Sequence, residues 1–235
     1  MNLVGHAHPK DWYEYDVRGS VELLGAYIAD IEKQVTKGIA DYKRGTTTIV
    51  VDDEYGEEGV RAVRLHKGLD DSTWHFPAVF EEYFPNLQRR AALITLYSFF
   101  EYEIEKLCGH LKEEEKLRLK ISDMADTGLK RCISYLDKVA GISMGLDSHL
   151  WEKIQDIRRI RNLVVHTGGK LLDDAAVPKK NEVQTVARSA FLGGDRELTI
   201  AEGYLAEVLN TFDKYFQMID KEIKAKYSGN LINRL

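Results

Sequence analysis

The chain has 235 residues, and 44% of them are hydrophobic, which is enough to bury a substantial core in a folded globular protein. The formal net charge of −5 excludes a broad basic surface, so nucleic-acid binding has to use a local patch or the assembly of two chains. No signal-peptide pattern and no run of about 18 apolar residues is present, so we expect no membrane contact.

The first expected elements are a long helix and a hairpin. Residues 20–44 place apolar side chains at helical spacing, with Ser20 as the expected N-cap and Gly45 as the stop. A β-branched run, a glycine-containing turn and a loosely alternating run follow, and they predict a β-hairpin insertion near 46–66. This insertion either shapes a substrate or partner groove or is a plain surface ribbon, and its acidic turn argues against RNA binding there.

A second long helix is predicted up to about Leu111. A short helix over 77–84 is expected before Pro85, and the long helix then carries a continuous apolar stripe. Glu101 lies at the edge of that stripe rather than on its solvent side. The charge-dense residues 112–120 that follow are expected to form a solvated connector or helix end.

Two shorter helices are expected next. Residues 126–140 keep helical apolar spacing and end at Gly141. Asp147 or Ser148 then caps a further helix. That helix is expected to end in the run 167–169, which contains two glycines.

The last part of the chain predicts a hairpin and a helix. The runs 183–192 and 197–200, separated by two glycines, are typical of a small second β-hairpin. Residues 199–202 have the sequence of a capping box, and a final amphipathic helix is expected to reach about Tyr227.

Together these elements predict a mainly α fold, an antiparallel helical bundle of about five main helices with two small β-hairpin insertions near 46–66 and 183–200. No linker or internal repeat divides the chain, so residues 1–235 are expected to form one domain. Cys108 and Cys132 fall on apolar faces of predicted helices without metal-ligand or redox spacing, which favours a reduced, cytoplasmic protein.

The stretch 154–169 carries the most informative residues. On a helix, its apolar residues form one stripe, and Arg161 projects from the middle of that stripe. A buried guanidinium needs a carboxylate, a phosphate or a wet cleft. Asn162 and His166 lie together on the adjoining face, and about 140° separates His166 from Arg161 on an ideal helix. One helix therefore presents the pair poorly, whereas two copies across a twofold axis would bring both pairs to one cleft.

This stretch resembles the end of the signature helix of the HEPN family (higher eukaryotes and prokaryotes nucleotide-binding), in which an Arg, a polar residue and a later His form a ribonuclease motif. The matching positions are Arg161, Asn162 and His166. Arg61 and His66 have the same spacing but lie in a predicted strand, so spacing alone does not define the motif. The resemblance, which covers roughly residues 87–227, implies a site shared by two chains, with Glu101 as the acidic partner of Arg161.

The residue types suit RNA cleavage, because RNA carries its own nucleophile in the 2′-OH. We expect His166 to act as the general acid or base and Arg161 to hold the phosphate as negative charge builds up. Asn162 is expected to position either group. Arg158 and Arg159, one turn earlier, are expected either to bind the flanking RNA backbone or to form a solvated basic edge. The alternative for the whole motif is structural, with Arg161 paired to Glu101 and no catalysis.

Other chemistries lack their sequence patterns. No two histidines have metal-ligand spacing with a matching acidic residue, so no metal site is expected. No glycine-rich phosphate loop and no Gly-x-Ser-x-Gly element is present, which disfavours P-loop nucleotide hydrolases and serine hydrolases. We expect no cofactor.

Two functions remain. The first is a homodimeric, metal-independent endoribonuclease, which the HEPN resemblance places in toxin–antitoxin or antiphage defence, with RNA as substrate and an antitoxin or defence protein as partner. The second is a noncatalytic HEPN-like module that binds RNA or nucleotide, or that scaffolds a defence or toxin–antitoxin complex.

Overall fold

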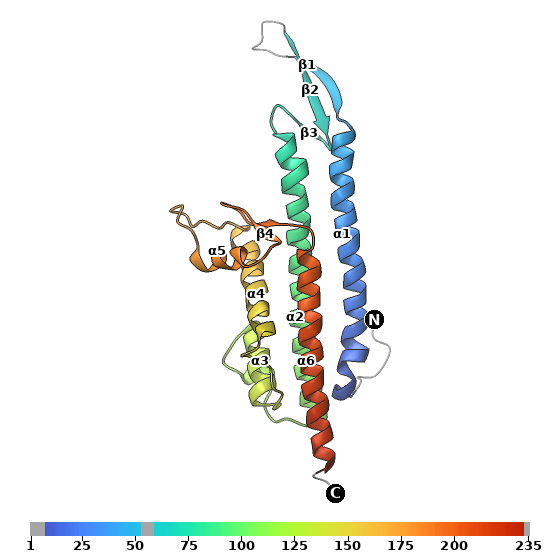
Figure 1. The fold of residues 1–235 in the computed structure, drawn as a ribbon, viewed down its shortest axis with the longest axis vertical. Coiled ribbons are helices and arrows are strands. Elements are labelled where there is room, and N and C mark those ends of the chain that lie inside the picture. The colour runs from blue at the N-terminus through green and yellow to red at the C-terminus, as the bar shows by residue number, and fades with distance from the viewer. Residues whose placement is uncertain (1–7, 53–58, 233–235) are drawn as a thin grey trace.

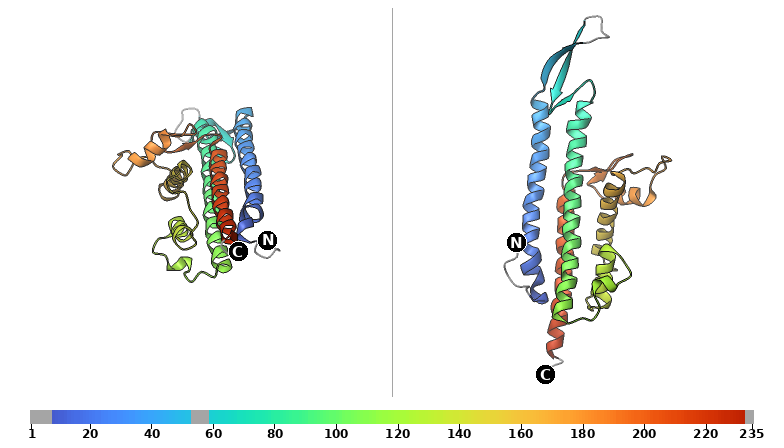
Figure 2. Two further views of the ribbon diagram at one scale, coloured as in Figure 1. Left: turned by 60° about the horizontal axis from the view of Figure 1, so that its bottom comes forward. Right: turned by 180° about the vertical axis from the view of Figure 1, so that it is seen from behind.

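The computed structural model describes residues 8–52 and 59–232 and has a mainly α fold. Three long helices, α1 (Arg18–Arg44), α2 (Phe84–Glu114) and α6 (Tyr204–Ile232), run side by side along the long axis (Figures 1 and 2). The shorter helices α3 (Gly128–Lys138) and α4 (His149–Thr167) pack on the flank of α2, and α4 also contacts α6. Within the described residues, no helix combines the length and hydropathy that crossing a bilayer requires.

The first helix begins earlier than predicted. A 3₁₀ turn (Pro9–Asp11) and a π-helical turn (Tyr13–Val17) lead directly into α1, so Ser20 lies inside the helix instead of capping it. Trp12 explains this start, because its fully buried ring packs edge-on against Phe216, with the ring centroids 5.6 Å apart. The N-terminal turns are therefore held by the core rather than by a cap.

The first predicted hairpin is confirmed. Strands β1 (Thr47–Asp52) and β2 (Val60–His66) pair antiparallel, and a short strand β3 (Leu69–Asp70) adds to β2. The expected turn between β1 and β2 falls mostly outside the described residues. The hairpin extends beyond the ends of α1 and α2 (Figure 1).

The expected break at Pro85 is wrong. A π-helical segment (Ala78–Tyr83) continues directly into α2, because Pro85 occupies the first turn, where its missing N–H removes little. α2 is the central helix of the fold and contacts α1, α3, α4 and α6. Its apolar stripe is fully buried, and Phe100 stacks on Phe212 with 4.4 Å between ring centroids.

The elements around α3 and α4 follow the predicted order. α2 ends at Glu114 inside the expected connector, and a 3₁₀ turn (Ile121–Asp123) precedes α3. Ser148, one of the two expected caps, accepts a hydrogen bond on its Oγ from the Trp151 N–H at 3.2 Å. The α4 helix therefore starts one residue after its cap.

The second predicted hairpin is wrong in most of its length. Residues expected to form its first strand instead form a short helix, α5 (Lys180–Ala187), whose Thr185 and Val186 are buried. Only the two-residue strands β4 (Leu192–Gly193) and β5 (Thr199–Ile200) pair. Burial of one face of this segment in the tertiary structure favours a helix, although the sequence pattern predicted a strand.

The capping box expected at 199–202 is also absent, because Thr199 and Ile200 belong to β5. Here the Asn86 side chain of α2 supplies hydrogen bonds that a neighbouring strand would otherwise make. Its Nδ2 donates to the Leu198 carbonyl at 2.8 Å, and its Oδ1 accepts from the Ile200 N–H at 3.0 Å. The final helix begins only afterwards, at Tyr204, and runs past the expected end to Ile232.

A buried polar cluster joins the π-helical turn before α1 to α2. The Lys106 Nζ lies 2.6 Å from Asp16 and 3.8 Å from the Glu103 carboxylate, and the His110 ring lies 3.7 Å from Asp16. The Glu103 side chain is only 5% exposed, and this burial raises its pKa from 4.5 to about 7 although Lys106 opposes the shift. Two carboxylates thus compete for Lys106.

Stability should therefore depend on pH through Glu103. Its folded pKa exceeds the unfolded value of 4.5, so the folded state binds the proton more tightly, and wild type should lose stability as pH rises from 4.5 to about 7. Glu103→Gln cannot ionise and should lack this loss, which amounts to about 3 kcal/mol. Urea unfolding at several pH values measures it. Glu105→Gln, at an exposed position of the same helix, is the control. Parallel pH curves for wild type and Glu103→Gln would contradict the assignment.

Candidate functional site

α4 presents two different faces to its surroundings. Its apolar side, Ile154, Ile157, Ile160 and Leu163, is buried against the bundle. The helix ends at Gly168, whose left-handed backbone (φ +62°) lets its N–H bond the Leu163 and Val164 carbonyls. The expected motif residues lie between this buried stripe and solvent.

Arg161 faces α2. Its Nη2 lies 3.6 Å from the Glu101 carboxylate, and the guanidinium carbon lies 5.1 Å from the ring centroid of Tyr97. Its Nη1 donates to Asn162 Oδ1 at 3.0 Å. The side chain is 23% exposed, so a carboxylate and an aromatic face together offset its partial desolvation. The expected pairing of Arg161 with Glu101 is present.

Glu101 is held from two sides. Arg161 and Arg158 on α4 favour its charged form, and so, to a smaller extent, does the Leu129 N–H at the start of α3. Burial nevertheless dominates and raises the pKa of Glu101. Glu101 thus connects α2, α3 and α4 at a single carboxylate.

His166 points elsewhere, into a shallow groove of about 460 Å³ along the solvent side of α4. The lining residues come from α4 and from the start of the α5 region: Gln155, Arg158, Arg159, Asn162, Leu163, His166, Thr167, Lys179 and Glu182. The imidazole itself is exposed. Four of the six expected site residues, Arg158, Arg159, Asn162 and His166, therefore meet in one groove, while Arg161 and Glu101 lie beside it.

Asn162 links the two parts. It lines the groove and also accepts the hydrogen bond from Arg161, so the orientation of its amide is fixed from the α2 side. The charge in the groove is positive, because Arg158, Arg159 and Lys179 outnumber Glu182. Such a surface attracts an anion even on a chain of net negative charge.

Sequence reasoning missed Lys179 and Glu182. The sequence predicted a strand over 183–192 and no helix before it, so it gave no indication that these side chains would lie beside α4. The short helix α5 instead packs against α4 and delivers them to the groove. Lys179 is fixed further by its hydrogen bond to the Lys170 carbonyl at 2.8 Å.

Arg90 of α2 was also missed, and it positions the end of α4. This side chain, 9% exposed, donates from Nη1 to the Gly168 carbonyl at 2.8 Å and from Nη2 to the Leu198 carbonyl. Burial lowers its pKa, although Glu197 lies 3.8 Å away. A cation on the last carbonyls of a helix is stabilised by the helix dipole.

Metal ligands are not gathered here. Across residues 8–52 and 59–232, no group of three or more His, Cys, Asp or Glu side chains has the geometry to hold a metal ion. What the groove offers is an imidazole, an amide and several cations, the groups that acid–base chemistry on a phosphate diester would use.

Substitution of the two glycines at the end of α4 should separate backbone strain from the Arg90 contact. Gly168→Ala adds a Cβ in open space at φ +62°, so it should cost about 1 kcal/mol of unfolding free energy. Gly169→Ala adds a Cβ 2.8 Å from the Arg90 guanidinium carbon at φ +86° and should cost about 2–4 kcal/mol. Urea unfolding compares the two variants, and equal losses of unfolding free energy would show that the Arg90 side chain moves aside without an energetic cost.

Comparison of the chain with protein-family models, with curated proteins and with solved structures gave no match. The resemblance to the HEPN family therefore rests on Arg161, Asn162, His166 and their setting on α4.

Proposed function

We propose that this protein is a metal-independent endoribonuclease whose active site is the groove along α4. The observation that carries the proposal is that an exposed imidazole, His166, shares one positively charged groove with Asn162, Arg158 and Arg159. A phosphodiester backbone is the anion that such a row of cations suits.

The reaction follows from these groups. His166 removes the proton from a ribose 2′-OH, and the 2′-oxygen attacks the adjacent phosphorus. The bond to the 5′-oxygen breaks, that oxygen takes a proton from water, and the imidazolium returns its proton to the solvent, so that a 2′,3′-cyclic phosphate and a 5′-hydroxyl result. Arg158 and Arg159 hold the nonbridging oxygens and the flanking backbone, and Asn162 orients the phosphate or the imidazole.

Arg161 requires a second chain to complete the site. Its contact with Glu101 is 3.6 Å long, beyond a good hydrogen bond, so the ion pair leaves Nη2 of the guanidinium able to bond a phosphate. When two α4 helices pack across a twofold axis, Arg161 of one chain clamps the phosphate that His166 of the other chain attacks. We place the enzyme in the cytoplasm as a toxin or antiphage effector that a partner protein restrains.

A noncatalytic role is the second candidate, and one observation favours it. Arg161 already has three partners within its own chain, Glu101, Asn162 and the Tyr97 ring. In that case the groove only binds RNA or nucleotide, and the protein acts as a scaffold in a defence or toxin–antitoxin complex.

Cleavage assays with single-stranded RNA in EDTA test the proposal. His166→Ala should lower the cleavage rate about 100-fold or more, and Arg161→Ala by a similar factor, because proton transfer and phosphate clamping each contribute on that scale. His75→Ala, at an exposed position before the π-helical segment 78–83, is the control and should cleave like wild type.

Each alternative leaves its own result. Equal cleavage by wild type and by both variants would assign the activity to a contaminant. No cleavage by wild type, together with weaker RNA binding by Arg161→Ala, would establish the noncatalytic role. Light scattering on the same samples reports whether the active species is a dimer.

A further inference from the structure

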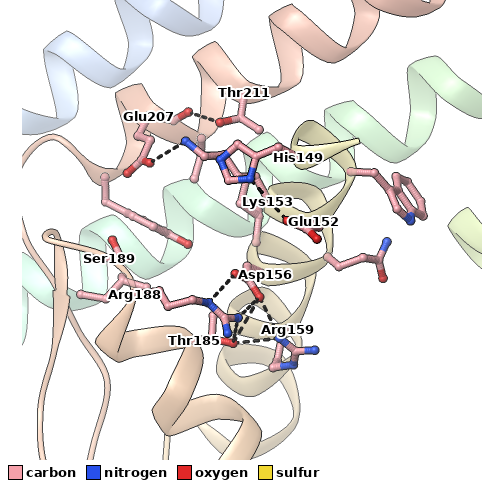
Figure 3. Close-up of a pocket in the computed structure, with 16 residues that line it drawn as sticks. His149, Glu152, Lys153, Asp156, Arg159, Thr185, Arg188, Ser189, Glu207 and Thr211 are labelled. Atoms are coloured by element: carbon pink, nitrogen blue, oxygen red, sulfur yellow. Dashed lines mark hydrogen bonds and ion pairs between the residues drawn. The ribbon is translucent and has the colours of Figure 1, made fainter. Parts of the chain in front are cut away.

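A larger cavity, of about 710 Å³, lies next to the groove between α4, α5 and α6 (Figure 3). It is not needed for the reaction proposed above, because His166 does not line it. One part of its wall is apolar and aromatic, formed by Trp151, Ile157, Leu192, Tyr204 and Val208. This volume is in the range of pockets that hold small organic ligands.

Two arginines converge on one carboxylate in the opposite wall. Asp156 Oδ1 accepts from Arg188 Nη2 at 2.6 Å and from Arg159 Nη1 at 2.8 Å. The buried Thr185 hydroxyl of α5 lies 3.3 Å from this oxygen and accepts a hydrogen bond from Arg159 Nη1 at 2.8 Å. Figure 3 shows Asp156 enclosed by these three side chains. Two positive charges on one negative charge leave an excess of one positive charge at this end of the cavity.

Lys153 lies 3.6 Å from Glu207, so these two charges are matched. The His149 ring lies 3.4 Å from Glu152 and offsets its charge only when the imidazole is protonated. The excess positive charge lies at the Arg159–Arg188 end of the wall. These two side chains are 34% and 57% exposed, so a ligand can reach them.

The arginines also keep donors for a ligand. The hydrogen bonds to Asp156 and Thr185 use Nη1 of Arg159 and Nε and Nη2 of Arg188. Among the described residues, nothing accepts a hydrogen bond from Nη2 of Arg159 or Nη1 of Arg188. Guanidinium groups fixed in this way suit a phosphate, which accepts several hydrogen bonds in fork geometry.

We propose that this cavity binds a nucleotide, with its phosphate on Arg159 and Arg188 and its base against the apolar wall of α4 and α6. The volume exceeds what inorganic phosphate or a free amino acid fills, and a planar base packs favourably against an apolar wall such as this one. The nucleotide is either free or an unstacked residue of an RNA strand.

The second of these possibilities, a nucleotide within an RNA strand, rests on the proposed function. The cavity and the groove share Gln155 and Arg159, so a strand lying in the groove can place one nucleotide in the cavity. The cavity would then select the base next to the cleaved bond, because a base taken out of the stack is recognised by stacking and edge contacts.

Calorimetric titration of AMP, GMP, CMP and UMP tests the binding site without requiring cleavage. At least one of them should bind wild type, and Arg188→Ala should weaken that binding about tenfold or more, because a charge-assisted hydrogen bond is lost. The matching nucleoside and inorganic phosphate should each bind at least about tenfold more weakly than the nucleotide. Arg188→Lys keeps the charge without the fork and should lie between wild type and Arg188→Ala.

The control is Arg44→Ala, which removes an exposed arginine from a surface ion pair on α1 and should bind like wild type. A second titration uses 2′-O-methyl RNA, which cannot be cleaved by its own 2′-oxygen. Arg188-dependent binding of a mononucleotide assigns the free ligand, and Arg188-dependent binding of RNA alone assigns the strand. The proposal would be overturned if mononucleotide and RNA both bind without dependence on Arg188, or if neither binds. An inactive wild type in the cleavage assay leaves the mononucleotide result standing.

Discussion

The burial of Arg90 against the C-terminal end of α4 is the interaction on which the groove depends. One guanidinium from the central helix bonds the carbonyls of Gly168 and Leu198, and so ties the end of α4 to the loop that leads into β5. The same loop pairs with the residue after the α4 end, since the Leu198 N–H donates to the Gly169 carbonyl at 2.8 Å. His166 stands two residues before Gly168, so its place follows from this anchor. A helix end without such partners would fray.

Position on α4 then divides the motif residues between two environments. A helix turns about 100° per residue, so Arg161 and His166 cannot face one point within a single chain. The structure turns Arg161 to Glu101 and Tyr97, and His166 to the groove. Asn162 is the only motif residue that takes part in both, through the bond from Arg161. A site that needs both residues therefore has to be assembled from two chains, whereas a binding site needs only the groove side.

Local pattern predicted the parts of the fold that have strong local signals. The long helices, the helix cap at Ser148 and the hairpin β1–β2 follow from apolar spacing, capping chemistry and β-branched runs. The cost of a desolvated charge predicted that Arg161 needs a partner, and the resemblance to the HEPN family indicated Glu101. The stretch from 180 to 202 was predicted poorly because its structure is decided by distant groups. Asn86 forms hydrogen bonds with Leu198 and Ile200, which lie 112 and 114 positions away in the sequence. Thr185 of α5 contacts Asp156 and Arg159 of α4. The residues close in sequence therefore do not indicate which structure this stretch adopts.

The structure of residues 183–192 also determines the charge balance beside α4. A strand over these residues, as the sequence predicted, would not bring Arg188 to α4. Folded as α5, the segment brings Arg188 to Asp156 at 2.6 Å, and Asp156 then has to satisfy two guanidinium groups at once. Asp156 can neutralise only one of them, so the second charge is available at the boundary between the cavity and the groove. Arg159 lines both the cavity and the groove, so an anion that it holds in one leaves fewer of its donors for the other. If both proposals hold, binding at the two sites is coupled through this side chain.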